Sequence, residues 1–208
     1  MSESTLASYN TRFVPQLFDV LISTIFAPFG GIHRLRVQAI EFADIGKDTR
    51  VLELGCGTGA ITRLMLERGA RITAVDGSYR MLERARQCAA GADFVQQELE
   101  SLSITGQFDV VLFAFVLHEL PRSLRREVLM KATQSLTRSG AVVVVDHAVP
   151  KRGLVAKAWR GMLMRLEPAT VAECIEEGYE SDMHCAGLHV TNRRELAAGT
   201  ASITVSRR

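Results

Sequence analysis

Short apolar runs alternate with segments of helical period through the middle of the chain. The runs are rich in Val, Ile and Phe, and they lie at residues 50–54, 71–76, 92–97, 108–113 and 141–146. Runs of this length, separated by helical segments, are typical of buried parallel strands joined by crossover helices. The pattern therefore predicts an α/β fold with a doubly wound, Rossmann-like sheet and helices on both faces.

Three segments between these runs carry apolar residues at helical spacing. The first follows Gly59, the second is capped by Ser78, and the third opens at Pro121, a residue tolerated in the first turn of a helix. The stripes consist of Ile61, Leu64 and Met65; of Met81, Leu82, Ala85 and Ala89; and of Leu124, Val128, Ala132 and Leu136. We expect Gly140 to end the third helix. Residues 1–49 and 149–187 break the rhythm, so we expect them to cover a ligand.

The sequence VLELGCGTGA, residues 51–60, places a glycine-rich turn directly after the first predicted strand. Gly55, Gly57 and Ala60 fit the dinucleotide-binding pattern, and Gly59 is an additional glycine. Because glycines allow a sharp turn and the next helix presents free N–H groups, such a loop binds ligands at the carboxyl edge of the sheet. Either a pyrophosphate or an amino acid would suit this loop.

Three carboxylates surround the loop in the predicted fold. Glu53 precedes the first glycine by two residues, Asp76 follows Gly55 by 21 residues, and Glu98 follows the third strand. A carboxylate at the position of Asp76 accepts hydrogen bonds from ribose hydroxyls in both ligand classes. The loop contains no Lys or Arg, so these charges would repel a pyrophosphate and attract a sulfonium or an ammonium group. The charge pattern favours a cationic ligand.

Composition narrows the function classes only slightly. Hydrophobic residues make up 47% of the chain and charged residues 23%, as in an ordinary single globular domain, and the net charge of +2 predicts no nucleic-acid partner. The cysteines have neither disulfide nor zinc-type spacing, so we expect reduced thiols and no metal site. They are Cys56, Cys88, Cys174 and Cys185. The N-terminus lacks a secretion signal, and polar residues, Pro and Gly interrupt the apolar segment 13–32, so we expect a cytoplasmic protein.

Taken together, these segments resemble the class I S-adenosylmethionine-dependent methyltransferases, in particular the type 11 and type 25 groups. Residues 51–59 are similar to the first motif of that family, and 74–78 with the helix after them are similar to the second. Residues 108–111 and the exit Leu117-His118-Glu119-Leu120 are similar to the fourth strand, and Ser139-Gly140-Ala141 resembles the small residues before the fifth. The resemblance covers about residues 48–148.

The resemblance implies one methyltransferase domain over 1–208 and a sheet of seven strands with the last antiparallel. The core would span 50–148, with an N-terminal helical cover at 1–49, a substrate lid at 149–187 and a closing hairpin at 188–208, built from strands 189–195 and 201–206. It also implies S-adenosylmethionine as cofactor and S-adenosylhomocysteine as product. The implied cofactor contacts are Tyr9, Glu53, Gly55, Cys56, Gly57, Gly59, Asp76, Gly77, Met81, Glu98, Leu99 and Ala114. Relatives often have Gly-Asp after the third strand, whereas this chain has Gln97-Glu98.

Two histidines are candidates for the chemistry. His118 follows the fourth predicted strand and His147 follows the fifth, so both lie at the ligand edge of the sheet. Methyl transfer is an in-line displacement, and a base is needed only where the acceptor must lose a proton. A phenol or an activated ring carbon would benefit from either imidazole, whereas an amine must enter deprotonated. The sequence leaves these acceptors open.

The segment KRGLVAKAWRGMLMRL, residues 151–166, carries five positive charges and no acid. Its apolar residues have helical spacing, so it is either a helix that contacts an anionic membrane or a lid whose apolar side packs on the domain. The acids of residues 167–182 offer a way to neutralise it. With Asp146-His147 and the apolar segment 13–32, it is similar to small bacterial phospholipid N-methyltransferases and quinone C-methyltransferases, which suggests a small-molecule or membrane-derived acceptor. The alternatives are a cofactor-binding protein with another role and an NAD(P)-dependent oxidoreductase.

Overall fold

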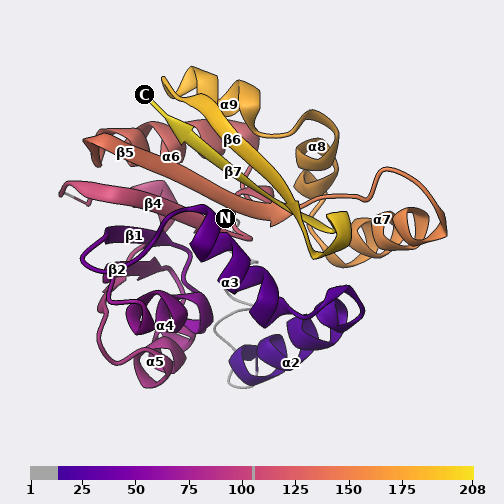
Figure 1. Ribbon diagram of the computed structural model, residues 1–208, viewed down its shortest axis with the longest axis horizontal. Coiled ribbons are helices and arrows are strands. Elements are labelled where there is room, and N and C mark those ends of the chain that lie inside the picture. The colour runs from indigo at the N-terminus through magenta and orange to yellow at the C-terminus, as the bar shows by residue number, and fades with distance from the viewer. Residues whose placement is uncertain (1–13, 105) are drawn as a thin grey trace.

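The computed structural model describes residues 14–104 and 106–208, and its centre is a seven-stranded sheet (Figure 1). The strand order is β3-β2-β1-β4-β5-β7-β6. The strands are β1 (Arg50–Leu54), β2 (Arg71–Asp76), β3 (Asp93–Gln96), β4 (Phe108–Ala114), β5 (Leu136–His147), β6 (His189–Leu196) and β7 (Ala201–Arg207). All pairs from β3 to β5 are parallel, and β7 runs antiparallel to both β5 and β6. The α/β fold with an antiparallel last strand is thus confirmed.

Alternating side chains give the sheet two apolar faces, and helices cover both. Val51 packs with α3 (Ile32–Phe42), α4 (Ala60–Glu67) and α5 (Tyr79–Cys88) on one face. Leu52 and Leu54 face α6 (Arg122–Gln134) and α9 (Glu180–Cys185) on the other. The period of two therefore turns Glu53, which lies between the two leucines, toward the α4 side.

The third predicted helix ends earlier than its apolar stripe indicated. Helix α6 stops at Gln134, and Leu136 already pairs with Phe108 as the first residue of β5. The expectation that Gly140 ends this helix is wrong. A Cβ at Gly140 would lie 2.9 Å from the carbonyl oxygen of Phe108, next to an irregularity in the β4–β5 register. Gly140 is therefore required because the two strands approach closely there.

Two groups of helices precede and follow the parallel part of the sheet. Before β1 stand α2 (Val14–Phe26), a short 3₁₀ turn and α3. After β5 come α7 (Leu154–Leu166), α8 (Thr170–Glu177) and α9. In Figure 1, α2 and α7 lie at the same end of the molecule. Among residues 14–104 and 106–208, none of these helices is long and apolar enough to cross a membrane.

Helix α7 uses only part of its apolar stripe for packing. Trp159 and Leu163 are buried, and the Trp159 indole N–H donates to the carbonyl of Ala148 at 2.9 Å. Val155 and Leu166 are exposed instead. The acids after α7 do not mainly neutralise the basic segment 151–166. Glu173 and Glu177 bind arginines of α6 instead. Within the described chain, one ion pair, Arg160 with Glu176, joins the basic and acidic segments.

Candidate functional site

A cavity of about 410 Å³ lies at the carboxyl ends of β1, β2, β4 and β5. Helices α2, α3 and the end of α7 wall it, so it occupies the switch in strand order between β1 and β4, where open α/β sheets bind ligands. The candidate residues that line it are Glu53, Gly55, Cys56, Gly57, Asp76, Gly77, Met81, Glu98, Leu99, Ala114, His118 and His147. Gly59 is not among the lining residues, and Tyr9 lies outside the described residues.

The three glycines of the loop have positive φ angles but different surroundings. A Cβ at Gly55 would lie 2.4 Å from a methyl carbon of Val116, and one at Gly59 would lie 2.9 Å from the backbone of Ala85 in α5. At Gly57, with φ of 54°, a Cβ would meet nothing within 4 Å. Gly57 therefore leaves its space to the cavity, whereas Gly59 serves the packing of the loop on α5.

Asp76 ties the glycine loop to the end of β2. Its carboxylate accepts the N–H of Gly57 and the N–H of Ser78, both at 2.8 Å. Burial raises the pKa of Asp76, and these two amide donors oppose the rise. Each oxygen retains a second lone pair, so the carboxylate can hold the loop and still accept a hydrogen bond from a ligand hydroxyl.

Glu53 is the most deeply buried acid of the loop region. Its side chain is turned toward α4, where Oε2 accepts the Thr62 hydroxyl at 2.7 Å. Its Oε1 is buried and has no hydrogen-bond partner among the described residues. Burial raises the pKa of Glu53 to about 8, and the hydrogen bond from Thr62 and the charge of Arg36 oppose the rise. A cationic donor placed against Oε1 would satisfy the orphaned oxygen and favour its charged form.

Two residues of the N-terminal helices reach the site and were missed by the sequence reasoning. Arg36 of α3 lines the cavity; burial lowers its pKa, while the charges of Asp19 and Glu53 favour its charged form. Asp19 of α2 accepts the hydroxyl of Thr58 in the glycine loop at 2.7 Å. The site therefore contains a cation, although the loop itself has none. No local motif marks either residue, because both sit in helices far from the loop in sequence.

At the other end of the cavity, a hydrogen-bonded network holds His118. Its Nδ1 lies 2.7 Å from Oδ1 of Asp146, and both side chains are buried. Asp146 also accepts the hydroxyl of Tyr179 at 2.8 Å and the backbone N–H of His147 at 2.8 Å. Burial alone would lower the pKa of His118, but Asp146 and Glu167 outweigh it and raise this pKa well above its ordinary value. The Asp146 carboxylate fixes the orientation of the ring.

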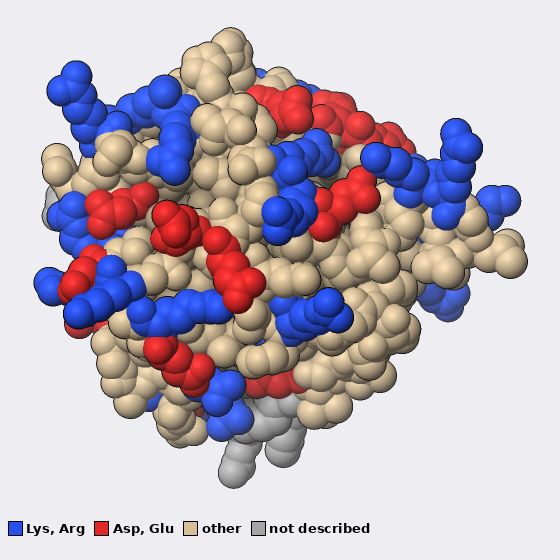
Figure 2. Space-filling model, in the orientation of Figure 1, with Lys and Arg blue, Asp and Glu red and all other residues tan. Residues whose placement is uncertain are grey.

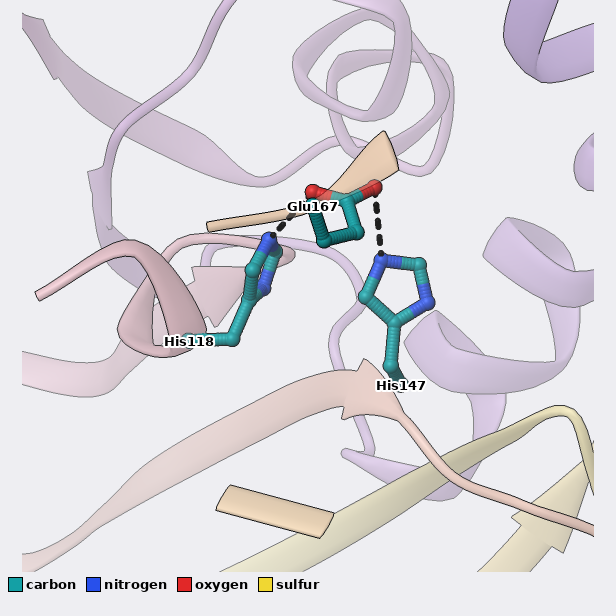
Figure 3. A group of neighbouring side chains, drawn as sticks. All are labelled: His118, His147 and Glu167. Carbon is teal, nitrogen blue, oxygen red and sulfur yellow. Dashed lines mark ion pairs between the residues drawn. The ribbon is translucent and has the colours of Figure 1, made fainter. Parts of the chain in front are cut away.

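His147 and Glu167 complete this end of the cavity (Figure 3). The Glu167 carboxylate lies between the two imidazoles, with Oε2 3.3 Å from Nε2 of His118 and Oε1 3.5 Å from Nε2 of His147. Burial would raise the pKa of Glu167, but the two histidines lower it strongly. Sequence reasoning missed Glu167, which follows α7 directly and is the first acid after the basic segment.

Known proteins are similar to this chain in sequence and in fold. Residues 51–140 match the model of the methyltransferase domain family. A ubiquinone biosynthesis O-methyltransferase of Erwinia tasmaniensis is 27% identical over 196 residues, 84% of this chain and 80% of the relative. A demethylmenaquinone methyltransferase of Tropheryma whipplei is 28% identical over 189 residues, 81% of this chain and 78% of the relative. The solved complex of DhpI with SAM and HEP has a TM-score of 0.74 at 21% identity, covering 99% of this chain and 97% of that one.

The chain is thus an S-adenosylmethionine-dependent methyltransferase with the class I fold. The order of its strands, the position of its glycine loop and the matched segment agree on this class. A fold of this kind is compatible with many acceptors, so the acceptor has to be inferred from the second half of the cavity.

Proposed function

We propose that the cofactor lies along the glycine loop with its methionine end between Glu53 and Arg36. Oε1 of Glu53 receives the ammonium group, and the guanidinium of Arg36 attracts the carboxylate. Gly57 leaves room for close approach, and Asp76 accepts the ribose hydroxyls while Met81 and Leu99 border the adenine. The methionine end carries a positive ammonium group and a negative carboxylate. The site offers a group of opposite charge for each, the buried Glu53 and Arg36, and this match supports the proposal.

We further propose that the acceptor is a phenol or quinol with an apolar body. The observation that carries this proposal is the pairing of two buried imidazoles at one end of a cavity whose α2 wall is apolar. That wall consists of Leu21, Ile22, Ile25 and Phe26. An imidazole pair suits a hydroxyl, because a hydroxyl can both donate and accept hydrogen bonds. Relatives named for ubiquinone and demethylmenaquinone biosynthesis support an aromatic oxygen or ring carbon over an amine.

In the proposed reaction the cavity supplies position more than covalent chemistry. The acceptor atom forms a bond to the methyl carbon as the bond from that carbon to sulfur breaks, and a neutral thioether leaves. The cavity excludes water and holds the acceptor atom and the methyl carbon in line, and this positioning supplies much of the acceleration. His118 and His147 lie at the end of the cavity that we assign to the hydroxyl whose proton is lost, so they are the residues that we assign to the chemical step.

The surface next to the cavity supports delivery of this acceptor from a membrane. Helices α2 and α7 expose large apolar side chains beside the cavity, and Leu21 and Leu166 also line it. The exposed residues are Leu17, Val20, Leu21, Leu154, Val155, Met164 and Leu166. Lys157 and Arg165 are exposed on α7, and Figure 2 shows basic side chains around the region that Figure 1 labels α7. Apolar and cationic side chains together favour an anionic lipid surface.

An acceptor screen tests the proposed chemistry directly. The protein is incubated with methyl-labelled S-adenosylmethionine and, in turn, a catechol, a demethylated quinol with a short isoprenoid tail, and phosphatidylethanolamine. We expect label in the catechol or quinol and none in the amine lipid. Calorimetric titration runs in parallel and should show binding of S-adenosylhomocysteine and none of NADH. Transfer to the amine lipid alone would overturn the acceptor assignment and leave the enzyme class intact.

Vesicle sedimentation tests the membrane surface separately. We expect the protein to sediment with phosphatidylglycerol vesicles and not with phosphatidylcholine vesicles. Leu154→Ser combined with Val155→Ser should reduce this binding several-fold, whereas Met130→Ser, at an exposed apolar position on α6, should leave it unchanged. Equal loss in both variants, or no binding of the wild-type protein, would contradict delivery through α7.

A further inference from the structure

Three polar side chains from separate parts of the chain meet in the acceptor half of the cavity. His118 lies in the 3₁₀ turn Leu117–Glu119, His147 ends β5, and Glu167 follows α7. Each offers one ligand atom, and these atoms lie within 4.8 Å of one another. Figure 3 shows both imidazole Nε2 atoms directed at the Glu167 carboxylate. No sequence spacing marks this group, because its members are 29 and 20 residues apart.

The distances within the group differ from those of ordinary charged hydrogen bonds. Charge-assisted N–H···O bonds measure about 2.7–2.9 Å, and the His118–Asp146 contact has such a length at 2.7 Å. The two contacts to Glu167 measure 3.3 and 3.5 Å. Nitrogen and oxygen ligands that share a metal ion at about 2.1 Å lie roughly 3.0–3.5 Å apart in octahedral and tetrahedral geometry. The two contacts end on different oxygens of Glu167, so each separation matches one edge of a coordination shell in which the carboxylate binds through both oxygens.

Asp146 prepares His118 for such a role. When Nδ1 of His118 carries the proton and forms the hydrogen bond to Asp146, Nε2 has a free lone pair that faces Glu167. A carboxylate that holds the far nitrogen of a ligand imidazole is the usual outer partner in metal sites. Asp146 is itself held by Tyr179 and by the backbone of His147, so the ring of His118 is oriented before any ion binds.

His147 provides an independent observation. Its side chain is only 6% exposed, and its Nδ1 has no hydrogen-bond partner among the described residues. Within the described part of the chain, its Nε2 has one charged partner, Glu167 at 3.5 Å. A nearly buried imidazole without a hydrogen bond of normal length is costly, and an ion bound at Nε2 would offset the part of that cost that belongs to this nitrogen. The carboxylates of Asp146 and Glu167 would also balance the charge of a dication.

We propose that His118, His147 and Glu167 bind a first-row divalent metal ion, such as Zn²⁺, that receives the acceptor oxygen in the cavity. Imidazole nitrogens with one carboxylate are typical ligands for ions of this class. Three protein ligands leave positions open, and these positions face the space that we assign to the acceptor. The role of the ion in catalysis rests on the proposed function, whereas its binding does not.

The ion would account for the fate of the acceptor proton. A hydroxyl bound to a divalent cation has a lower pKa and loses its proton to water, and its oxygen becomes the nucleophile. That oxygen then forms its bond to the methyl carbon while the carbon–sulfur bond breaks. No oxidant or reductant takes part. The substrate class narrows to acceptors that carry a metal-binding oxygen, with adjacent oxygens on one ring as the best fit.

Metal binding is tested on the chelator-treated full chain, without cofactor or acceptor. Zn²⁺ is titrated by calorimetry, and Co²⁺ is added while the visible absorbance of bound cobalt is recorded. We expect one ion per chain, with affinity at least about tenfold lower in Glu167→Gln and about 10–100-fold lower in Asp146→Asn, because ligand and supporting groups both determine affinity. Circular dichroism and S-adenosylhomocysteine titration show whether each variant keeps its fold.

The matched control removes the other neighbouring imidazole pair in the described chain. His184 and His189 have ring centroids 5.6 Å apart and are exposed at the surface. The double variant His184→Ala, His189→Ala should bind Zn²⁺ within twofold of the wild-type protein. Zn²⁺ binding that is lost in this variant and retained in Glu167→Gln would overturn the site, as would the absence of any binding.

The failures of the two proposals give different results. Metal binding that depends on Glu167, without methylation of any catechol or quinol, would support the metal site and contradict the acceptor class. Methylation of a quinol at the same rate after chelation and after added Zn²⁺, with no calorimetric binding, would contradict the metal site and support the acceptor class.

Discussion

The two halves of the cavity are built in different ways. The cofactor half consists of the glycine loop and the ends of β1 and β2, and its contacts are mostly between backbone groups and nearby acids, as between Asp76 and Gly57. The acceptor half consists of side chains from the exits of β4, β5 and α7, and its contacts span 28 residues between His118 and Asp146 and 49 between His118 and Glu167.

This difference explains which half is recognisable in a sequence. A loop that shapes a ligand site with its backbone needs glycines at set positions, and these are visible as a motif. A site made of side chains needs only that several strands end at one edge of the sheet. The acceptor half can therefore change its chemistry without altering the cofactor half, which is how one fold serves many acceptors.

The largest expected effect separates turnover from cofactor binding. His118→Ala should lower kcat with a quinol acceptor at least about 10²-fold, because a group that handles the acceptor proton supplies effects of that size. Affinity for S-adenosylhomocysteine should stay within threefold of wild type. Steady-state kinetics and calorimetry measure the two quantities. A parallel loss of affinity would show that the two halves are not independent.

Gly59→Ala should mainly lower the stability of the protein, whereas Gly57→Ala should mainly lower its affinity for the cofactor product. At Gly59 a Cβ would meet the backbone of Ala85, so strain and overpacking together should lower the free energy of unfolding by about 2–4 kcal/mol. At Gly57 only the φ penalty of about 1–2 kcal/mol applies, and the methyl group would enter the cavity. Urea unfolding and S-adenosylhomocysteine titration should rank the variants oppositely. The same ranking in both experiments would contradict this division.

Asp76→Ala should weaken S-adenosylhomocysteine binding at least about tenfold, because it removes a charged acceptor worth about 1.5–3 kcal/mol. Asp76→Asn keeps the shape of the side chain and one acceptor oxygen, so its loss should be smaller. Calorimetric titration at constant pH compares them. Wild-type affinity in Asp76→Ala would remove Asp76 from the cofactor site and leave it as a loop tether only.

The cofactor half should also make the free energy of unfolding depend on pH. The pKa of Glu53 is about 8 in the fold, above about 4.3 in the unfolded chain, so the folded chain keeps a proton that the unfolded chain loses. This contribution to stability is full below about pH 4.3 and falls as pH rises toward 8, by at most about 1.4 kcal/mol per pH unit. Urea unfolding of the unliganded protein at several pH values should show this slope, and Glu53→Gln should lack it. Identical slopes would contradict the role of Glu53.

The sequence by itself determined the strands and the glycine loop of the cofactor half. Strands 50–54 and 71–76 have the predicted bounds, and Glu53, Gly57 and Asp76 line the cavity as expected. These features are local, because strand periodicity and a glycine turn depend on neighbours along the chain. Ligand contacts at these residues stay predictions, as does the division of the chain into cover, core and lid.

Only the tertiary structure decided the rest. Arg36 and Glu167 reach the cavity because α3 and α7 pack against the sheet, and nothing near them in sequence indicates it. Gly140 belongs to a strand because β4 and β5 approach closely there, although the apolar stripe of α6 continues to Leu136 in the sequence. Local patterns specify the elements, whereas the meeting of distant side chains depends on register and packing, which are set by the whole core at once.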